Sequence, residues 1–149
     1  MLRYSPGTDS GTFDYFVEAV MDPVYVLSDA DEGKGKEAIL NASNTQFSED
    51  DNVLVQGVEG SPYAIGYFGF AYYNENKDLL KALSIDGVAP TAETAEDNSY
   101  PLSRPLFIYS DPAIMQSKPQ VAAFINFYLT YVNDEIIDVG YFPASVEAW

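Results

Sequence analysis

The residues best suited to chemistry lie near the start of the chain, between Pro6 and Phe13. Turn-forming residues lead there into small hydroxyl side chains, and an apolar pattern with helical spacing follows. If Ser10 is the N-cap of a helix, the N–H groups of Gly11, Thr12 and Phe13 have no acceptor within that helix. Free N–H groups at the positive end of the helix dipole favour an anion.

Two hydroxyls and a glycine strengthen this interpretation. The hydroxyls of Ser10 and Thr12 can donate hydrogen bonds to the oxygens of an oxyanion. Gly11 has no side chain, so an oxyanion can approach its backbone closely. The same three residues are also what an ordinary helix cap and turn require, so the segment alone leaves both interpretations open.

The absence of histidine and cysteine argues against an enzyme. Histidine is the commonest general base and metal ligand, and cysteine supplies thiolate nucleophiles, sulfur ligands and disulfides. A hydrolase would have to use carboxylates such as Asp50 and Asp51 with tyrosines, and we find no nucleophile motif. We therefore expect no catalytic residues, no metal site and no cofactor.

The charge is strongly acidic, with 23 Asp and Glu against 7 Lys and Arg, a formal net charge of −16. This charge argues against nucleic acid as a partner. We interpret it as a solvated surface that keeps the protein soluble. No stretch is long and apolar enough for a transmembrane helix, and the first residues lack the features of an export signal.

The first half of the chain shows several strand and helix patterns. Phe13, Phe16, Val17 and Val20 have the spacing of one buried helix face. The expected elements are a strand at Leu2–Ser5, a helix capped by Ser10, irregular chain at 22–47 with an exposed loop at 29–35 and a helical turn at 37–40, a helix at 52–56 that follows a capping box at 48–51 and ends at Gly57, and a buried strand at 64–73.

The second half is expected to contain shorter elements and one longer helix. Pro119 occupies a favoured first helical position, and Val121, Phe124, Ile125, Tyr128 and Val132 form an apolar stripe behind it. The expected elements are a helix at 77–83, a strand at 84–85, a loop with a helical turn at 89–97, an extended segment at 100–109 and a helix from 119 to about 133. Alternation of strands and helices predicts an α/β or α+β sandwich.

A wider resemblance bears on the first segment. The segment Pro6–Phe16 resembles the phosphate-binding loop and following helix of the periplasmic phosphate-binding proteins that serve ABC-type importers. Later segments resemble the same family in the same order, whereas 22–47 matches poorly. These later segments are 48–58, 64–73, 100–109, the closing helix and 139–143.

The resemblance implies an α/β fold of the periplasmic-binding-protein type (type II), a three-layer sandwich represented by one lobe and a C-terminal return segment. Residues 1–99 would form the second lobe, which carries the phosphate loop. Residues 100–149 would form a crossing segment and C-terminal helices that belong partly to the first lobe. Such proteins hold phosphate between two lobes, so we expect this chain to supply only half of the cleft.

The same resemblance implies the site residues. The family's phosphate contacts fall on Ser10, Gly11 and Thr12. Arg3 could donate in a bidentate manner, although its spacing is longer than the family's pattern and a strand position would explain it equally. Asp9 could orient Arg3 or accept a phosphate proton, and turn formation or capping would also explain it. Arg104 is expected to pair structurally.

The function implied is binding of inorganic phosphate, without catalysis, as all or part of the solute-binding component of an ABC-type phosphate uptake system. Location would be periplasmic or extracellular, at the cell surface. Partners would be the importer's membrane subunits and either a separately made N-terminal lobe or a second copy of the chain. The alternative is a truncated structural or interaction fragment that has lost phosphate binding, and a hydrolase ranks last.

Overall fold

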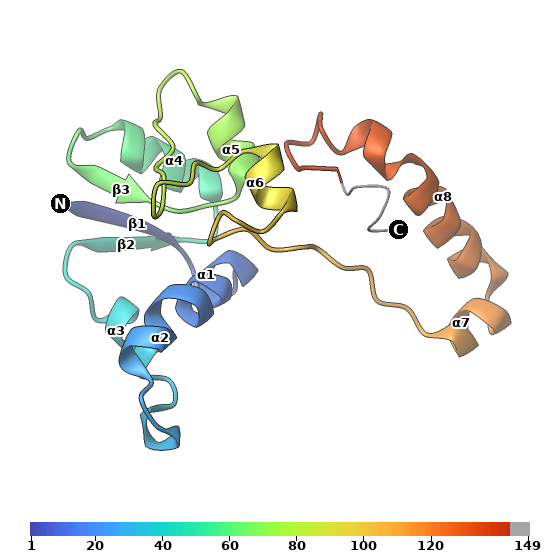
Figure 1. The fold of residues 1–149 in the computed structure, drawn as a ribbon, viewed down its shortest axis with the longest axis horizontal. Coiled ribbons are helices and arrows are strands. Elements are labelled where there is room, and N and C mark those ends of the chain that lie inside the picture. Colours follow the sequence, from blue (N-terminus) through green and yellow to red (C-terminus); the bar gives the residue numbers. More distant parts are fainter. Residues whose placement is uncertain (144–149) are drawn as a thin grey trace. The chain divides into compact units, whose positions relative to one another are not determined.

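The computed structural model describes residues 1–143, which fall into two compact units. The first unit is Met1–Leu83 and the second begins at Ser84 (Figure 1). The first unit contains the sheet and the loop singled out above. The predicted boundary between residues 99 and 100 concerns lobes of a larger protein and stays a prediction.

A three-stranded parallel sheet forms the centre of the first unit, in the order β2-β1-β3. Its strands are β1 (Leu2–Pro6), β2 (Thr45–Ser48) and β3 (Ala64–Gly66). Pro6 lies opposite Ser48, and Tyr4 lies opposite Gly66. The carboxyl ends of all three strands therefore meet at one edge of the sheet.

Helices follow each strand of the first unit. The segment after β1 is helical from Gly11 to Tyr25 with one wide turn in its middle, and α4 and α5 follow the other strands. The helices of this unit are α1 (Gly11–Phe16), the π-helix η1 (Val17–Met21), α2 (Asp22–Tyr25), the 3₁₀ turn η2 (Asp29–Asp31), α3 (Lys34–Leu40), α4 (Asp51–Glu59) and α5 (Phe70–Glu75).

Side chains of β1 show that helices cover both faces of the sheet. The ring of Tyr4 packs against Gly57 of α4. The next residue, Ser5, bonds to Tyr67, whose ring stacks on Phe16 of α1. Because successive strand residues point to opposite faces, α4 and α1 lie on opposite sides of the sheet (Figure 1). This three-layer arrangement confirms the predicted α/β class.

The core has one cluster on each face. Phe13, Val17 and Ile39 are buried together, with Phe16, Met21 and Tyr67 packed against them. Leu54 and Val55 of α4 are buried on the other face. The predicted helix face is confirmed by buried Phe13 and Val17, with Phe16 and Val20 partly buried on the same face.

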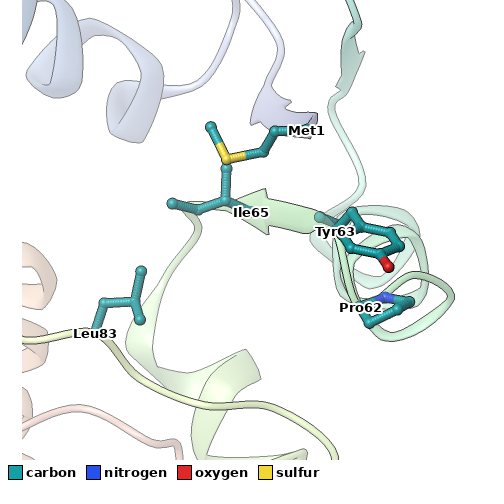
Figure 2. A pocket seen from close by; sticks show the side chains of 6 residues that line it. Met1, Pro62, Tyr63, Ile65 and Leu83 are labelled. Atoms are coloured by element: carbon teal, nitrogen blue, oxygen red, sulfur yellow. The ribbon is translucent and has the colours of Figure 1, made fainter.

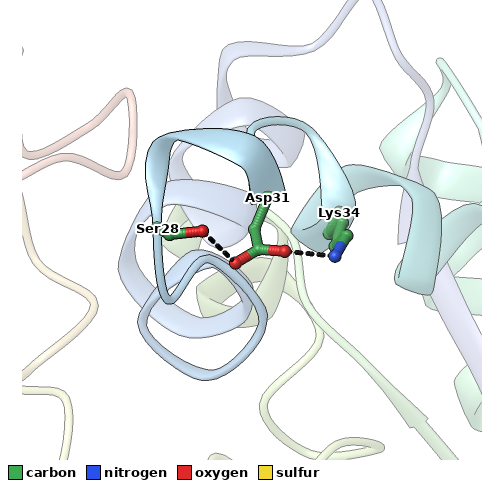
Figure 3. Close-up of polar contacts among 3 residues, drawn as sticks. All are labelled: Ser28, Asp31 and Lys34. Atoms are coloured by element: carbon green, nitrogen blue, oxygen red, sulfur yellow. Dashed lines mark hydrogen bonds and ion pairs between the residues drawn. The ribbon is translucent and has the colours of Figure 1, made fainter.

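The expectation of irregular chain at 22–47 is wrong, because α2 and most of β2 lie there, whereas the helical turn predicted at 37–40 is confirmed within α3. The short strand Thr45–Ser48 carries no run of β-branched or apolar residues that would have indicated it. Within the predicted exposed loop at 29–35, Asp31 accepts a hydrogen bond from Ser28 and pairs with Lys34 at the start of α3 (Figure 3). Local polar contacts therefore order this segment.

Two glycines lie in other elements than those predicted for them. Gly57 lies inside α4, which continues to Glu59. The ring of Tyr4 occupies the space that a side chain at position 57 would need, which accounts for a glycine within the helix. The capping residue of α4 is Asp50, whose carboxylate accepts from Asn52 N–H at 2.9 Å. The predicted strand 64–73 ends at Gly66, and Gly69 caps α5.

Two short predicted elements are also wrong. In place of the helix predicted at 77–83, residues 77–79 form a turn and 80–83 have no regular structure, with the N–H groups of Leu79 and Leu80 donating to the carbonyl of Asn76. The predicted strand at 84–85 is a single bridge between Ile85 and Val88. Neither segment contains enough residues of one period to sustain a helix or a strand.

The second unit contains α6 (Ala92–Glu96), α7 (Pro112–Ser117) and α8 (Pro119–Glu135). The helical turn predicted within 89–97 and the helix predicted from 119 are confirmed, whereas α7 was not predicted. Chain without helix or strand runs from 103 to 111, after a turn at 100–102. Several large apolar side chains of this unit are exposed, namely Leu106, Phe107, Ile108, Tyr109, Phe124, Phe127 and Tyr131. None of the helices described within residues 1–143 has the length and apolar character needed to cross a membrane.

Candidate functional site

The candidate site is the loop at 7–10 that joins β1 to α1. It lies at the carboxyl edge of the sheet, where β2 and β3 also lead into helices, capped by Asp50 and Gly69. The chain passes from central β1 to β2 on one side and then returns past β1 to β3. In open α/β sheets, ligands bind beyond the carboxyl ends of strands at such a reversal of strand order.

Ser10 is the N-cap of α1, as predicted. Its backbone is extended (φ −92, ψ 128), and its hydroxyl oxygen accepts from Thr12 N–H at 3.2 Å. Asp14 N–H donates to the Ser10 carbonyl at 3.2 Å and is the first amide to bond back along the helix. The N–H groups of Gly11, Thr12 and Phe13 precede that bond and have no carbonyl acceptor within the helix.

The loop is held from two sides. Ser10 N–H donates to the Gly7 carbonyl at 3.1 Å, which closes a tight turn. Gly7 N–H donates to the Ser48 carbonyl at 3.0 Å, and Asp9 N–H donates to Glu49 Oε1 at 3.3 Å. The turn is therefore tied to the end of β2, while Gly11 stays exposed.

The structure brings together four of the five predicted site residues. Asp9, Ser10, Gly11 and Thr12 lie consecutively on the loop and the first turn of α1. Arg3 lies early in β1, and its Nη1 donates to the Ser43 carbonyl at 2.7 Å, in the turn before β2. Its guanidinium thus stabilises the opposite end of the strand in this structure.

Tyr67, the residue after β3, packs between β1 and α1. Its hydroxyl is 2.6 Å from Ser5 Oγ, and its ring stacks on Phe16 with centroids 4.0 Å apart. Burial raises the pKa of the Tyr67 hydroxyl, and the hydrogen bond with Ser5 opposes that rise. The neutral phenol therefore fixes α1 against the sheet, as expected of a core aromatic.

The carboxylates considered for hydrolysis are engaged at the start of α4. Asp50 caps the helix, and burial raises the pKa of Asp51, with Asp50 adding to the rise and the Gly69 N–H opposing it. Within residues 1–143 there is no cluster of three or more acidic, His or Cys side chains suited to a metal ion.

An open hollow of about 400 Å³ lies at the other end of the strands. It is lined mainly by apolar side chains at the starts of β1 and β3 and by Leu83 (Figure 2). Tyr63 is the one side chain among the lining residues that carries a hydrogen-bond donor, whereas the loop gathers two hydroxyls and the first N–H groups of α1, so we place the candidate site at the loop.

Sequence reasoning missed Glu49. It lies within the predicted capping box at 48–51, although Asp50 makes the cap and Glu49 bonds to the loop after β1. The available signal was Gly7, because a glycine beside a proline in a turn often marks a close approach by another group.

Comparison with known proteins assigns the chain to a family. Residues 3–131 match a PBP superfamily domain. The SphX protein of Synechocystis sp. is 43% identical over 98% of this chain and 41% of its own length. The phosphate-binding protein PstS of Staphylococcus haemolyticus is 37% identical over 93% of this chain and 40% of its own length. The chain thus spans about two fifths of these relatives.

Solved structures agree in fold. A crystal structure described as a possible phosphate binding protein from Planctomyces limnophilus is 37% identical with a TM-score of 0.68, over 98% of this chain and 49% of that one. PstS from Borrelia burgdorferi has a TM-score of 0.65 at 18% identity, which shows the fold alone. On the match over residues 3–131, this chain belongs to the PBP superfamily.

Proposed function

We propose that this chain binds inorganic phosphate at Ser10, Gly11 and Thr12, as all or part of the solute-binding component of an ABC-type phosphate uptake system. The observation that carries the proposal is the loop at the reversal of strand order, where a hydroxyl-capped helix begins. The names of the relatives, PstS and phosphate-binding protein, support phosphate as the anion.

The hydrogen bonds of Ser10 are compatible with a ligand. Its hydroxyl oxygen already accepts from Thr12 N–H, and a hydroxyl can donate its own proton at the same time. Phosphate oxygens would then accept hydrogen bonds from the hydroxyls of Ser10 and Thr12 and from the N–H of exposed Gly11. Asp9 lies beside them and can accept a hydrogen bond from the hydroxyl of a monohydrogen phosphate. Arg3 would contribute only after leaving the Ser43 carbonyl.

The proposal extends to the partners and location. The chain spans 41% of SphX and 49% of the Planctomyces limnophilus protein. We infer that a complete site draws further donors from a second lobe, supplied by a longer protein, a separate chain or a second copy. The other partners would be the importer's membrane subunits, at a periplasmic or cell-surface location, and no enzymatic step is involved.

A second function, that of an interaction fragment, is favoured by the apolar surface of the second unit. Phe107, Phe124 and Phe127 are each more than 60% exposed. Exposed apolar area of this kind is typical of surfaces that another chain covers. In that case the chain would associate with protein without needing phosphate.

Calorimetric titration of the full chain with phosphate, and separately with sulfate, distinguishes the two functions. Phosphate binding predicts saturable heat, weak for half a cleft because each missing charge-assisted hydrogen bond costs about 1.5–3 kcal/mol. Sedimentation of the same sample reports association. Association with no phosphate heat at millimolar concentration would overturn the first function in favour of the second.

A further inference from the structure

We propose that Glu49 is the positioning residue of the anion-binding loop: its carboxylate holds the turn at Gly7–Asp9 so that the start of α1 faces the anion. This inference rests on the proposed function, since it assigns a role within that site. Glu49 lies just after β2, 40 residues beyond Asp9 in the sequence.

The first support is the pair of ties between the two loops. Gly7 N–H donates to the Ser48 carbonyl, which continues the parallel ladder by one residue. Asp9 N–H donates to Glu49 Oε1 at 3.3 Å. The first tie involves backbone alone and fixes where the turn begins. The second uses a side chain and fixes the turn immediately before Ser10.

The second support is the space beside Gly7. Gly7 is buried and its φ is not positive, so its backbone conformation would admit other residues. A Cβ placed there would collide with the carboxylate of Glu49. The glycine therefore makes room for Glu49, and the two residues form a matched pair.

Charge sets the sign of the effect on binding. The Glu49 carboxylate already accepts from Asp9 N–H, so we assign it a role through the loop, while its negative charge opposes phosphate. Glutamine keeps the acceptor oxygen for Asp9 N–H without the negative charge, whereas alanine loses both. A role in positioning thus predicts opposite behaviour for the two substitutions.

The test measures phosphate affinity and amide exchange in the full chain, with exposed Glu59 at the end of α4 as the control of equal charge change. Glu49→Ala should weaken phosphate binding by about three- to tenfold, the range for one hydrogen bond. Glu49→Gln should bind at least as tightly as the wild type, and Glu59→Ala should match the wild type. Equal affinities for Glu49→Ala and Glu59→Ala would overturn the inference.

Hydrogen exchange of the Asp9 amide, read by NMR without phosphate, keeps the inference testable if the chain binds no phosphate. Exchange should accelerate in Glu49→Ala and not in Glu49→Gln or Glu59→Ala. Absent phosphate binding with this exchange pattern would reject the proposed site and retain the loop-positioning contact. Unchanged exchange in Glu49→Ala would reject the contact.

A double-mutant cycle tests the matched pair. Gly7→Ala should displace the flexible carboxylate of Glu49 at small cost in stability and weaken phosphate binding about as Glu49→Ala does, and the double variant should bind no more weakly than either single variant. Additive losses of affinity in the double variant would show that Gly7 and Glu49 do not share the space.

Discussion

At the scale of single residues, Ser10 combines a structural and a binding role in one hydroxyl. It accepts from Thr12 N–H as an N-cap and retains a proton to donate. Its neighbour Gly11 is exposed at the first position of α1. A ligand can therefore reach the backbone at Gly11 while the cap stays intact.

Gly11→Val should abolish phosphate binding, because a β-branched side chain would occupy the approach to the first N–H groups of α1. The loss of stability should stay within about 1 kcal/mol, since one helical residue is exchanged. Calorimetry gives the affinity, and urea unfolding gives the stability.

The matched control for this substitution is Gly60→Val. Gly60 caps the far end of α4 with φ −66, which valine tolerates. The Gly60→Val variant should bind phosphate like the wild type. Normal binding by Gly11→Val would mean that the anion does not sit on this loop.

The residues that could be predicted from sequence were those with a local signature. Ser10, Gly11 and Thr12 follow turn formers and precede a periodic helix, so their place on one helix start was predictable. The placement of Arg3 and Glu49 depends on which strand lies beside β1. That pairing joins residues about 40 positions apart and leaves no periodic signal.

At the scale of elements, local pattern succeeded where one period continues for several turns, as in α8, and where a local cap marks the start of a helix, as in α1. It failed where side chains from elsewhere decide the boundary. Gly57 lies within α4, where the ring of Tyr4 packs against it. The aromatic run after Gly66 leaves the sheet and leads into α5. Aromatic residues without alternation do not distinguish a buried strand from a helix.

The start of α4 gives a pH prediction. Burial raises the pKa of Asp51 above 3.8, so between 3.8 and the raised value the folded protein binds more protons than the unfolded chain. The contribution of Asp51 to stability therefore falls as pH rises through that window. Asp51→Asn removes this penalty and keeps an acceptor for Gly69 N–H.

Urea unfolding between pH 3.5 and 7 should show Asp51→Asn gaining stability relative to the wild type as pH rises, then levelling off. Asp78→Asn, at an exposed position after α5, serves as the control for a lost charge. A stability difference for Asp51→Asn that stays constant or shrinks with rising pH would contradict the assignment of a buried carboxyl.

At the scale of the whole molecule, a net charge of −16 surrounds a site proposed for an anion. Solvated charges are screened within about 8–10 Å at physiological ionic strength, whereas backbone N–H groups act at hydrogen-bond distance. Local donors therefore hold the anion while the overall field slows its approach.

Added salt should accordingly accelerate phosphate association modestly. Stopped-flow mixing at increasing potassium chloride, followed by a fluorescent label near the loop, measures the rate. A steep fall in the association rate with salt would indicate a site steered by positive charge, which this account does not contain.

An NMR titration of the nitrogen-labelled full chain with phosphate shows whether the anion binds at the start of α1. Binding there should give saturable shifts that are largest at the amides of Gly11, Thr12 and Phe13, with little change at the hollow around Tyr63. Saturable shifts confined to another part of the chain, or none at the α1 amides at saturating phosphate, would contradict it.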